Sequence, residues 1–256
     1  MSEFFGLSPS LIAIALLVFV FAGFVKGLVG FGLPAIGLGL MTVFVGIEKA
    51  MLLILWPSFL TNVWQALSGG HLKMLVGRLW PFLATAVLTL GAGTFILTRV
   101  PEGVADLVLG LLMVAYALPM LAGFSFLLRD THVVPVGIAA GLVNGVFSGL
   151  TGAFVVPGII YLQALGLQRD ALIQAMGLLF LLSTIALGVS LGGFGLVGGG
   201  GMLASIALVA PALTGVWAGQ RFRRRFSDTA FRKLIQLAIL ALGLYLVPLG
   251  VLRLIQ

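Results

Sequence analysis

The residue with the clearest chemical potential is a lysine inside an apolar sequence. Lys26 separates two uncharged runs, 4–25 and 27–47, and directly precedes a glycine-rich stretch. A lysine at the centre of a lipid bilayer costs roughly 2.5–3.5 kcal/mol on insertion scales, so such a position needs an offsetting role. One interpretation is a counter-charge for an anionic ligand. The other is a lysine at a helix end whose ammonium group reaches the membrane interface.

Two glycine-rich turns are candidates to supply further hydrogen-bond donors. The first covers residues 27–34, and the second, residues 145–152, follows Asn144. Backbone N–H groups at helix N-termini carry partial positive charge and bind anions. Ser148 and Thr151 add hydroxyl donors in the second turn. Together these groups favour a binding site for a small anion.

The same glycines also have the spacing of helix-packing motifs. Gly23 and Gly27 are four residues apart, and Gly141, Gly145 and Gly149 continue the same pattern. Small residues at this spacing let membrane helices approach closely. We expect packing roles for Gly23 and Gly141, and ligand contacts for four glycines of the turns: Gly30, Gly32, Gly149 and Gly152.

Polar side chains also fall inside two later apolar segments. Asn62 and Gln65 lie in one of them, and Gln174 and Ser183 lie in the other. Polar groups inside a membrane usually face the interior of the helix bundle, where they bond a neighbouring helix or line a pathway. The candidate substrate-binding residues are therefore Lys26, Gly27, Gly30, Gly32, Asn62, Gln65, Asn144, Gly145, Ser148, Gly149, Thr151, Gly152, Gln174 and Ser183.

Residue usage argues against several other kinds of chemistry. The chain has no cysteine, and its two histidines, His71 and His132, fall in expected loops. An enzyme within the membrane would need a nucleophile, a base or metal ligands there. We therefore expect no enzyme activity, no cofactor and no metal site. The net charge of +7 is explained by basic loops at a membrane surface, so nucleic acid is not an expected partner.

These side chains must be positioned by membrane helices. The chain is 61% hydrophobic and only 8% charged, against about 25% charged in ordinary soluble domains. Charged residues divide it into apolar runs, and two long runs, 131–168 and 171–220, each contain a glycine-rich centre. Dividing both gives ten segments in an all-α integral membrane protein. The alternative is eight full spans, in which each glycine-rich centre is part of one long helix.

The ten segments fall into two similar halves. Residues 22–27 resemble residues 140–145 at a spacing of 118 (140 minus 22), which predicts a first repeat over 1–130 and a second over 131–256. A repeat of five segments inserts in opposite orientations in the two halves. Four segments, at matching places in the two halves, are short for a full span. We expect them to form two re-entrant hairpins whose turns meet near the membrane centre: 9–25 with 33–47, and 133–147 with 153–167.

Basic residues indicate the orientation. With loops 69–78 and 221–233 in the cytoplasm, 11 of the 14 Lys and Arg residues fall inside, and both termini fall outside. This distribution follows the positive-inside rule and favours the inverted ten-segment arrangement. Glu3 stands where a signal peptide would be basic, so the first apolar segment is expected to be retained.

Several stretches together resemble the TauE/SafE family of permeases, also called the toluene sulfonate uptake permease (TSUP) family: residues 22–32, 140–152 and 156–170, and the pattern Pro211, Gly215 and Gly219 before the basic loop. The resemblance implies a secondary transporter in a bacterial-type plasma membrane. Its substrate would be a small, often sulfur-containing anion such as a sulfonate, sulfoacetate or sulfite. Membrane lipid, and protons or another coupling ion, would be its further partners.

Two other functions are compatible with the same residues. An anion channel would have the same lining, and saturable, coupled flux would separate it from an alternating-access transporter. A scaffold that transports nothing is the third reading. The direction of transport and the oligomeric state are left open by the sequence.

Overall fold

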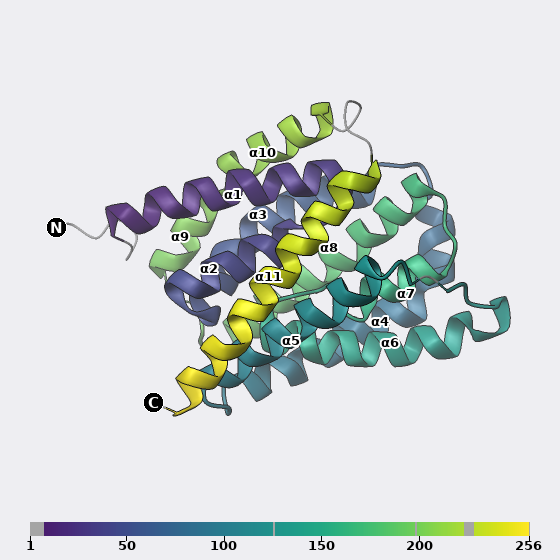
Figure 1. Ribbon diagram of the computed structural model, residues 1–256. Coiled ribbons are helices and arrows are strands. Elements are labelled where there is room, and N and C mark those ends of the chain that lie inside the picture. Colours follow the sequence, from purple (N-terminus) through teal and green to yellow (C-terminus); the bar gives the residue numbers. More distant parts are fainter. Residues whose placement is uncertain (1–7, 125, 198, 223–227, 256) are drawn as a thin grey trace.

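The computed structural model describes residues 8–124, 126–197, 199–222 and 228–255, and every regular element in these ranges is a helix (Figure 1). This confirms the predicted all-α membrane fold. In chain order the helices are α1 (Pro9–Val29), η1 (Leu33–Gly37, a π-helical turn), α2 (Leu38–Val45), α3 (Ile47–Leu67), α4 (Leu72–Leu97), α5 (Glu102–Leu121), α6 (Asp130–Thr151), α7 (Gly158–Ala164), α8 (Arg169–Gly193), α9 (Gly199–Ala207), α10 (Val209–Phe222) and α11 (Asp228–Ile255).

Eight segments in the described ranges are long and apolar enough to cross a membrane. They are α1, α3, α4, α5, α6, α8, the α9–α10 segment and α11. The η1–α2 segment and α7 are shorter. Helix α6 ends at Thr151, with Gly152 as its cap, and helix α8 ends at Gly193, so both glycine-rich centres interrupt a helix. The described ranges therefore contain ten segments, of which eight have full spanning length. This number of full spans agrees with the alternative, but its merging of each glycine-rich centre into one long helix is wrong.

The prediction that all four hairpin segments are short is also wrong. Helices α1 and α6 have 21 and 22 residues, which corresponds to about 30 Å at 1.5 Å per residue. Helix α1 continues through Lys26 and Gly27 because Gly27 packs directly against the backbone of α10. A glycine against which a neighbouring helix packs can lie inside a continuous helix and does not have to end that helix. Only the second arm of each hairpin is short.

Three helix pairs hold the bundle together through glycine contacts. Helix α1 packs on α10, α4 packs on α6, and α5 packs on α11. At Gly23 and Gly141, the neighbouring backbones of α10 and α4 leave no room for a Cβ atom. This confirms the packing roles expected for these two glycines. In lipid, such close approach stabilises helix pairs through dispersion contacts.

Helices α3 and α8 form the centre of the bundle and pack against each other. In the stretch of α3 that is long enough to span a membrane, about two thirds of the residues (67%) are buried inside the bundle. The short η1–α2 segment lies against both α1 and α3. Side chains on α3 are therefore screened from lipid, which suits it to carry polar residues.

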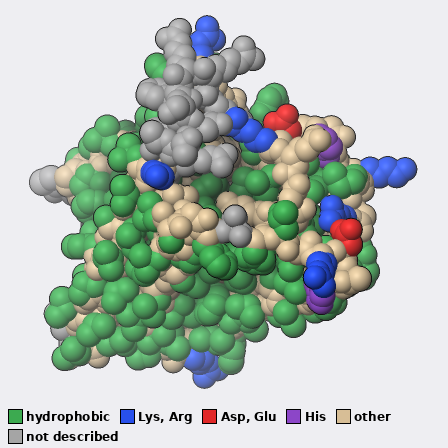
Figure 2. All heavy atoms as spheres, turned by 45° about the vertical axis from the view of Figure 1, so that its right-hand side comes forward, with side chains coloured by type: hydrophobic (Ala, Val, Ile, Leu, Met, Phe, Trp, Pro, Cys, Tyr) green, Lys and Arg blue, Asp and Glu red, His purple; other side chains and the backbone are tan. Residues whose placement is uncertain are grey.

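The bundle has two unlike ends. Both termini lie at the same end, which is on the left of Figure 1. Figure 2 shows charged side chains and histidines gathered at the other end, next to a broad hydrophobic surface. We call this the basic end. The residues exposed or half-exposed there include Lys73, Arg78, Arg129, Asp130, Arg169, Asp170 and Arg221.

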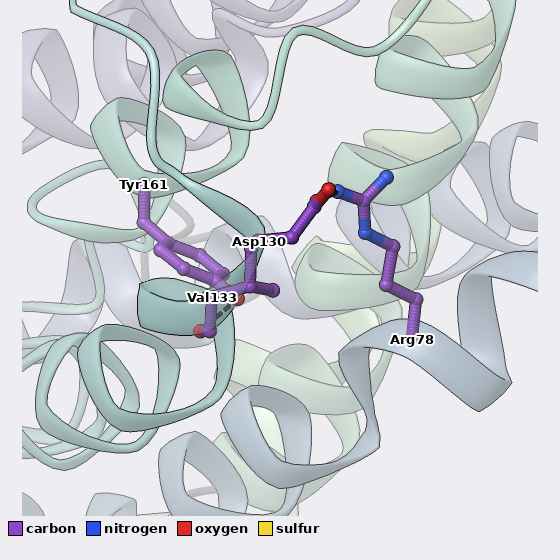
Figure 3. Close-up of polar contacts among 4 residues, drawn as sticks. All are labelled: Arg78, Asp130, Val133 and Tyr161. Atoms are coloured by element: carbon purple, nitrogen blue, oxygen red, sulfur yellow. Dashed lines mark hydrogen bonds and ion pairs between the residues drawn. The ribbon is translucent and has the colours of Figure 1, made fainter.

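Polar contacts fasten α4, α6 and α7 at the basic end (Figure 3). The Arg78 guanidinium of α4 forms an ion pair with the Asp130 carboxylate of α6 at 3.2 Å. The Tyr161 hydroxyl of α7 donates to the Val133 carbonyl of α6 at 3.0 Å. The Asp130 side chain is almost fully exposed (97%), so this ion pair adds little stability.

Candidate functional site

The strongest candidate site is built around Lys26 in the last turn of α1. Only 3% of this residue is exposed. Its Nζ donates to Thr61 Oγ1 of α3 at 3.0 Å and also to Asn62 Oδ1. Its place at the C-terminal end of a helix lets the helix dipole favour the ammonium group. Lys26 is in no ion pair with any residue that the structure describes.

The partners of Lys26 are themselves held in place. Thr61 donates its hydroxyl to the Pro57 carbonyl at 2.7 Å, which leaves its oxygen free to accept from Lys26. Asn62 donates its amide to Thr184 Oγ1 of α8 at 3.3 Å, and Thr184 donates to the Phe180 carbonyl. The Asn62 amide nitrogen therefore faces α8 and its oxygen faces the ammonium group. This network contains dipoles but no second charge.

A cavity of about 200 Å³ connects Lys26 to the basic end of the bundle. Its volume is smaller than that of pockets for drug-sized ligands, which is roughly 300–1,000 Å³. The carboxylate of Asp170 lies on its wall, at the start of α8. The lining residues are Lys26, Gly27, Gly30, Thr61, Trp64, Gln65, Ser68, Gly69, Asp170, Ile173, Val216 and Gln220.

Two glutamines link α3 with its neighbours. Gln65 donates its amide to the carbonyls of Gly30 and Ile173, at 2.7 and 2.8 Å. Gln174 donates to the Ala66 carbonyl at 2.8 Å and accepts from the backbone N–H of His71. Gln65 lines the cavity, whereas Gln174 does not. Of the two roles considered for such polar residues, the structure shows for Gln174 the hydrogen bond to a neighbouring helix.

The predicted residues of the second half build the turn between α6 and α7. Asn144 accepts from the backbone N–H of Gly158 at 2.9 Å and donates to Ser148 Oγ at 3.3 Å. Thr151 accepts from the backbone N–H of Ala153 at 3.2 Å. None of these side chains lines the Lys26 cavity. They satisfy one another and the local backbone.

The two glycine-rich turns do not meet, contrary to the prediction. Gly30 lies beside Ile173 and bonds Gln65 near the end of α3, whereas Gly152 lies against Met51 near its start. Gln65 and Met51 are separated by about 21 Å along the axis of α3, at 1.5 Å per residue. The physical reason is the full length of α1 and α6, which carry the turns toward opposite ends.

The glycines of the turns are less open to a ligand than their sequence suggested. The backbone N–H groups of Gly30 and Gly152 bond back to the carbonyls of Lys26 and Ser148, each at 2.8 Å. They close α1 and α6 with a left-handed residue that favours glycine. These two donors are therefore already used by the chain itself.

The remaining predicted glycines and Ser183 are buried. Gly145 and Gly149 pack against the backbone of α4, and Gly32 lies against Val25. Ser183 is 1% exposed on α8. Of the predicted set, the structure brings together five residues around one cavity or its hydrogen bonds: Lys26, Gly27, Gly30, Asn62 and Gln65.

Sequence reasoning gave too little weight to several residues of this site. Thr61 lies next to Asn62 and could have been found from that adjacency. Asp170 follows Arg169 at the start of α8, and Gln220 stands beside the basic run that begins at Arg221, so neither residue stands out in the sequence as part of a site. Nothing in the local sequence indicates that α10 reaches Lys26. Among the described residues, no group of three or more His, Asp or Glu side chains is placed to hold a metal ion.

The fold and the site define a class of protein. The described residues include eight segments of spanning length, and four helices, α1, α3, α8 and α10, line a polar cavity that leads from the basic end to a buried ammonium group. Such an arrangement is typical of a multi-pass membrane transporter.

Comparison with protein families gives the same class. The family described as "Sulfite exporter TauE/SafE" matches residues 15–246, which is nearly the whole chain. The protein belongs to the TauE/SafE family, a family of membrane transporters, and it is therefore not an enzyme. Comparison with curated proteins and with solved structures found no match.

Proposed function

We propose that this protein is a secondary transporter for a small sulfur-containing anion, with sulfite and sulfonates as the first candidates, and that Lys26 binds the anion. The observation that carries the proposal is a buried lysine whose hydrogen-bond partners are neutral. Burying a charge without a counter-charge is costly, and a bound anion removes that cost. The family description supports the substrate class.

The donors around the cavity suit an oxyanion. The Lys26 ammonium has three N–H donors, of which two bond Thr61 and Asn62. The third is available to a ligand, and Gln220, whose side-chain amide can donate, also lines the cavity. A sulfite or sulfonate group presents three acceptor oxygens, so it is able to engage more than one of these donors.

The shape of the site supports a carrier over an open channel. The cavity is lined by residues from the basic end of the bundle and ends at Lys26. A carrier closed on one side is expected to have such a cavity, whereas a conducting channel needs a continuous path. We assign the two halves that would move against each other to residues 1–130 and 131–256.

Helix packing supports this duplication, and the helix ends revise its spacing. Gly23 of α1 lies against the Ala212 carbonyl of α10, and Gly145 of α6 lies in the same way against the Ala86 carbonyl of α4. The next helical turns repeat both contacts. Gly141 lies against the Phe82 carbonyl in the same way, so packing alone permits a spacing of 118 or 122. The helix ends favour 122 (152 minus 30) over the 118 inferred from the sequence, because Gly30 and Gly152 close α1 and α6 with the same left-handed conformation and the same backbone hydrogen bond.

The revised spacing changes which residues correspond. Lys26 matches Ser148 instead of Asn144, so the charge is present in one half only. Asn62 matches Thr184, and these two side chains bond each other across α3 and α8. A contact between equivalent residues is what a two-fold axis between the halves would produce.

Orientation follows the distribution of charge. We propose that the basic end, with loops 69–78 and 221–233, faces the cytoplasm of a bacterial-type plasma membrane and that both termini face outward. Residues 223–227 of the second loop lie outside the described residues. The Lys26 cavity would then open to the cytoplasm, and a proton or another ion would be coupled to the anion.

Flux into proteoliposomes tests the proposal. Lys26→Met should reduce saturable sulfite or sulfoacetate flux at least about tenfold, because a charged hydrogen bond worth roughly 1.5–3 kcal/mol is lost. Lys73→Met, which removes an exposed lysine at the same end, is the matched control. Acetate, phosphate and taurine define the selectivity. Wild-type flux in the Lys26 variant would remove this residue from the site.

Counterflow separates a carrier from a channel. Unlabelled substrate trapped inside the vesicles should accelerate uptake of labelled substrate by a carrier, because the loaded protein reorients in both directions. Absence of counterflow together with non-saturating flux would favour the channel. Absence of any flux or binding would favour the scaffold.

A further inference from the structure

A second polar cavity, of about 230 Å³, opens at the end of the bundle that carries the chain termini. It lies at the junction of α2 and α3 and at the end of α4. The first turns of α5 and the last turn of α11 complete its wall. Its lining residues are Val45, Gly46, Ile47, Glu48, Lys49, Leu97, Val100, Asp106 and Arg253.

This cavity is distinct from the one at Lys26. Helix α3 contributes to both, with Ile47 at one end and Gln65 at the other. Eighteen residues of helix separate them by about 27 Å at 1.5 Å per residue, which is close to the roughly 30 Å thickness of the hydrocarbon core. The two cavities therefore face the two sides of the membrane.

An arginine–aspartate pair forms one wall. The Arg253 guanidinium of α11 donates through Nη1 to Asp106 Oδ2 of α5. The Asp106 side chain is 1% exposed, whereas that of Arg253 is 27% exposed toward the cavity. An arginine has five N–H donors. Arg253 makes no other hydrogen bond to the described residues, so its remaining donors are available.

Two further groups add positive potential to the cavity. Lys49 lines it and is exposed. Helix α3 begins there at Ile47, after Gly46, without a side chain that caps its N-terminus. Uncapped N–H groups at a helix start favour a negative ligand. Glu48 also lines the cavity and opposes these charges, as does Asp106.

We propose that this cavity is a second site for a small carboxylate or sulfonate anion, held by Arg253 and Lys49, with Asp106 as a built-in competitor. The guanidinium binds either the Asp106 carboxylate alone or the anion as well, since its planar fork presents donors on two edges. The proposal extends the proposed function: it gives the transported anion a docking position on the side opposite Lys26.

Opposite effects of two substitutions test the site. In a Lys26→Met background, sulfoacetate binding to the purified protein is measured by calorimetry. Arg253→Gln should weaken the remaining binding at least about tenfold, and Asp106→Asn should strengthen it several-fold by removing the competing carboxylate. Lys49→Met should weaken it less. Arg99→Gln, which removes a charge at the same end but outside the cavity, should leave it unchanged.

The design remains decisive if a single variant does not fold. Arg253→Gln removes the guanidinium from the buried Asp106 carboxylate, and breaking a buried ion pair on one side is strongly destabilising. The double variant Asp106→Asn with Arg253→Gln replaces the ion pair by neutral amides and should fold without binding sulfoacetate. Retained binding in the double variant, or equal affinities in all folded variants, would overturn the proposal. Failure of the Lys26 proposal is recognised by a different result: the Lys26→Met variant, in which Arg253 is intact, would show full flux.

Discussion

At the scale of single residues, the chemistry depends on what surrounds Lys26. Thr61 and Asn62 present oxygen atoms to its ammonium group, and Thr184 fixes the orientation of the Asn62 amide. These dipoles solvate the charge without neutralising it. A site of this kind keeps a net positive potential, so an anion is its natural ligand.

A carboxylate placed beside Lys26 should imitate the anion permanently. Asn62→Asp would form an internal ion pair in a buried setting. We expect transport to fall at least about tenfold, since the carboxylate competes for the same donors. The stabilisation that sulfite gives to the wild-type protein should fall to the part that the Arg253 cavity supplies, as it does in Lys26→Met.

Thermal melting with and without sulfite measures this effect. Asn62→Gln changes size and retains the amide, so it is the control for steric disturbance. A sulfite-dependent rise in melting temperature that keeps its full wild-type size in Asn62→Asp would show that the Lys26 site does not bind the anion.

At the scale of helices, glycine contacts decide how closely α1, α4 and α5 approach their partners. Gly93 of α4 lies against the Val146 carbonyl of α6, where no Cβ atom fits. Gly77, on the same helix, has no atom within 4 Å of its Cβ position. Both glycines lie inside α4, but only Gly93 is packed against a neighbouring helix.

Alanine substitution should separate these two roles. Gly93→Ala should destabilise the protein by about 1–3 kcal/mol through overpacking. Gly77→Ala should be neutral or stabilising by up to about 1 kcal/mol, because alanine favours the helix. Reversible unfolding in detergent compares the two variants, and equal effects would contradict the α4–α6 packing.

At the scale of the whole molecule, two cavities face opposite ends of a bundle whose charges are unevenly distributed. The cavity at Lys26 opens to the basic end, and the cavity at Arg253 opens beside the termini. Transport between them requires the path to be open to one side at a time. The similar packing of α1 on α10 and of α6 on α4 fits the two proposed halves, residues 1–130 and 131–256, that would move against each other.

The absence of cysteine makes the orientation directly testable. A single cysteine at Arg99 should react with a membrane-impermeant maleimide on intact cells. A cysteine at Lys73 should react only after the membrane is permeabilised, because the basic end is expected to face the cytoplasm. The reverse labelling pattern would invert the proposed orientation without changing the fold.

The sequence by itself determined that the protein lies in a membrane, how many segments it has and that Lys26 is the charge to explain. Its low content of charged residues requires a membrane, and its charges and glycine-rich centres mark ten segments. Lys26 stood out because a charge inside an apolar sequence is costly. These conclusions need only local composition, since lipid acts on each segment separately.

Tertiary structure decided which distant residues meet. Local sequence suggested that the glycines near Lys26 and Asn144 end their helices and bind a ligand together. Packing against α10 and α4 instead lets both helices continue to full length, which separates the two turns. Arg253 and Asp106 are 147 positions apart (253 minus 106), and their pairing depends on the crossing of α5 and α11. Such contacts depend on close approach of whole helices, which no local pattern encodes.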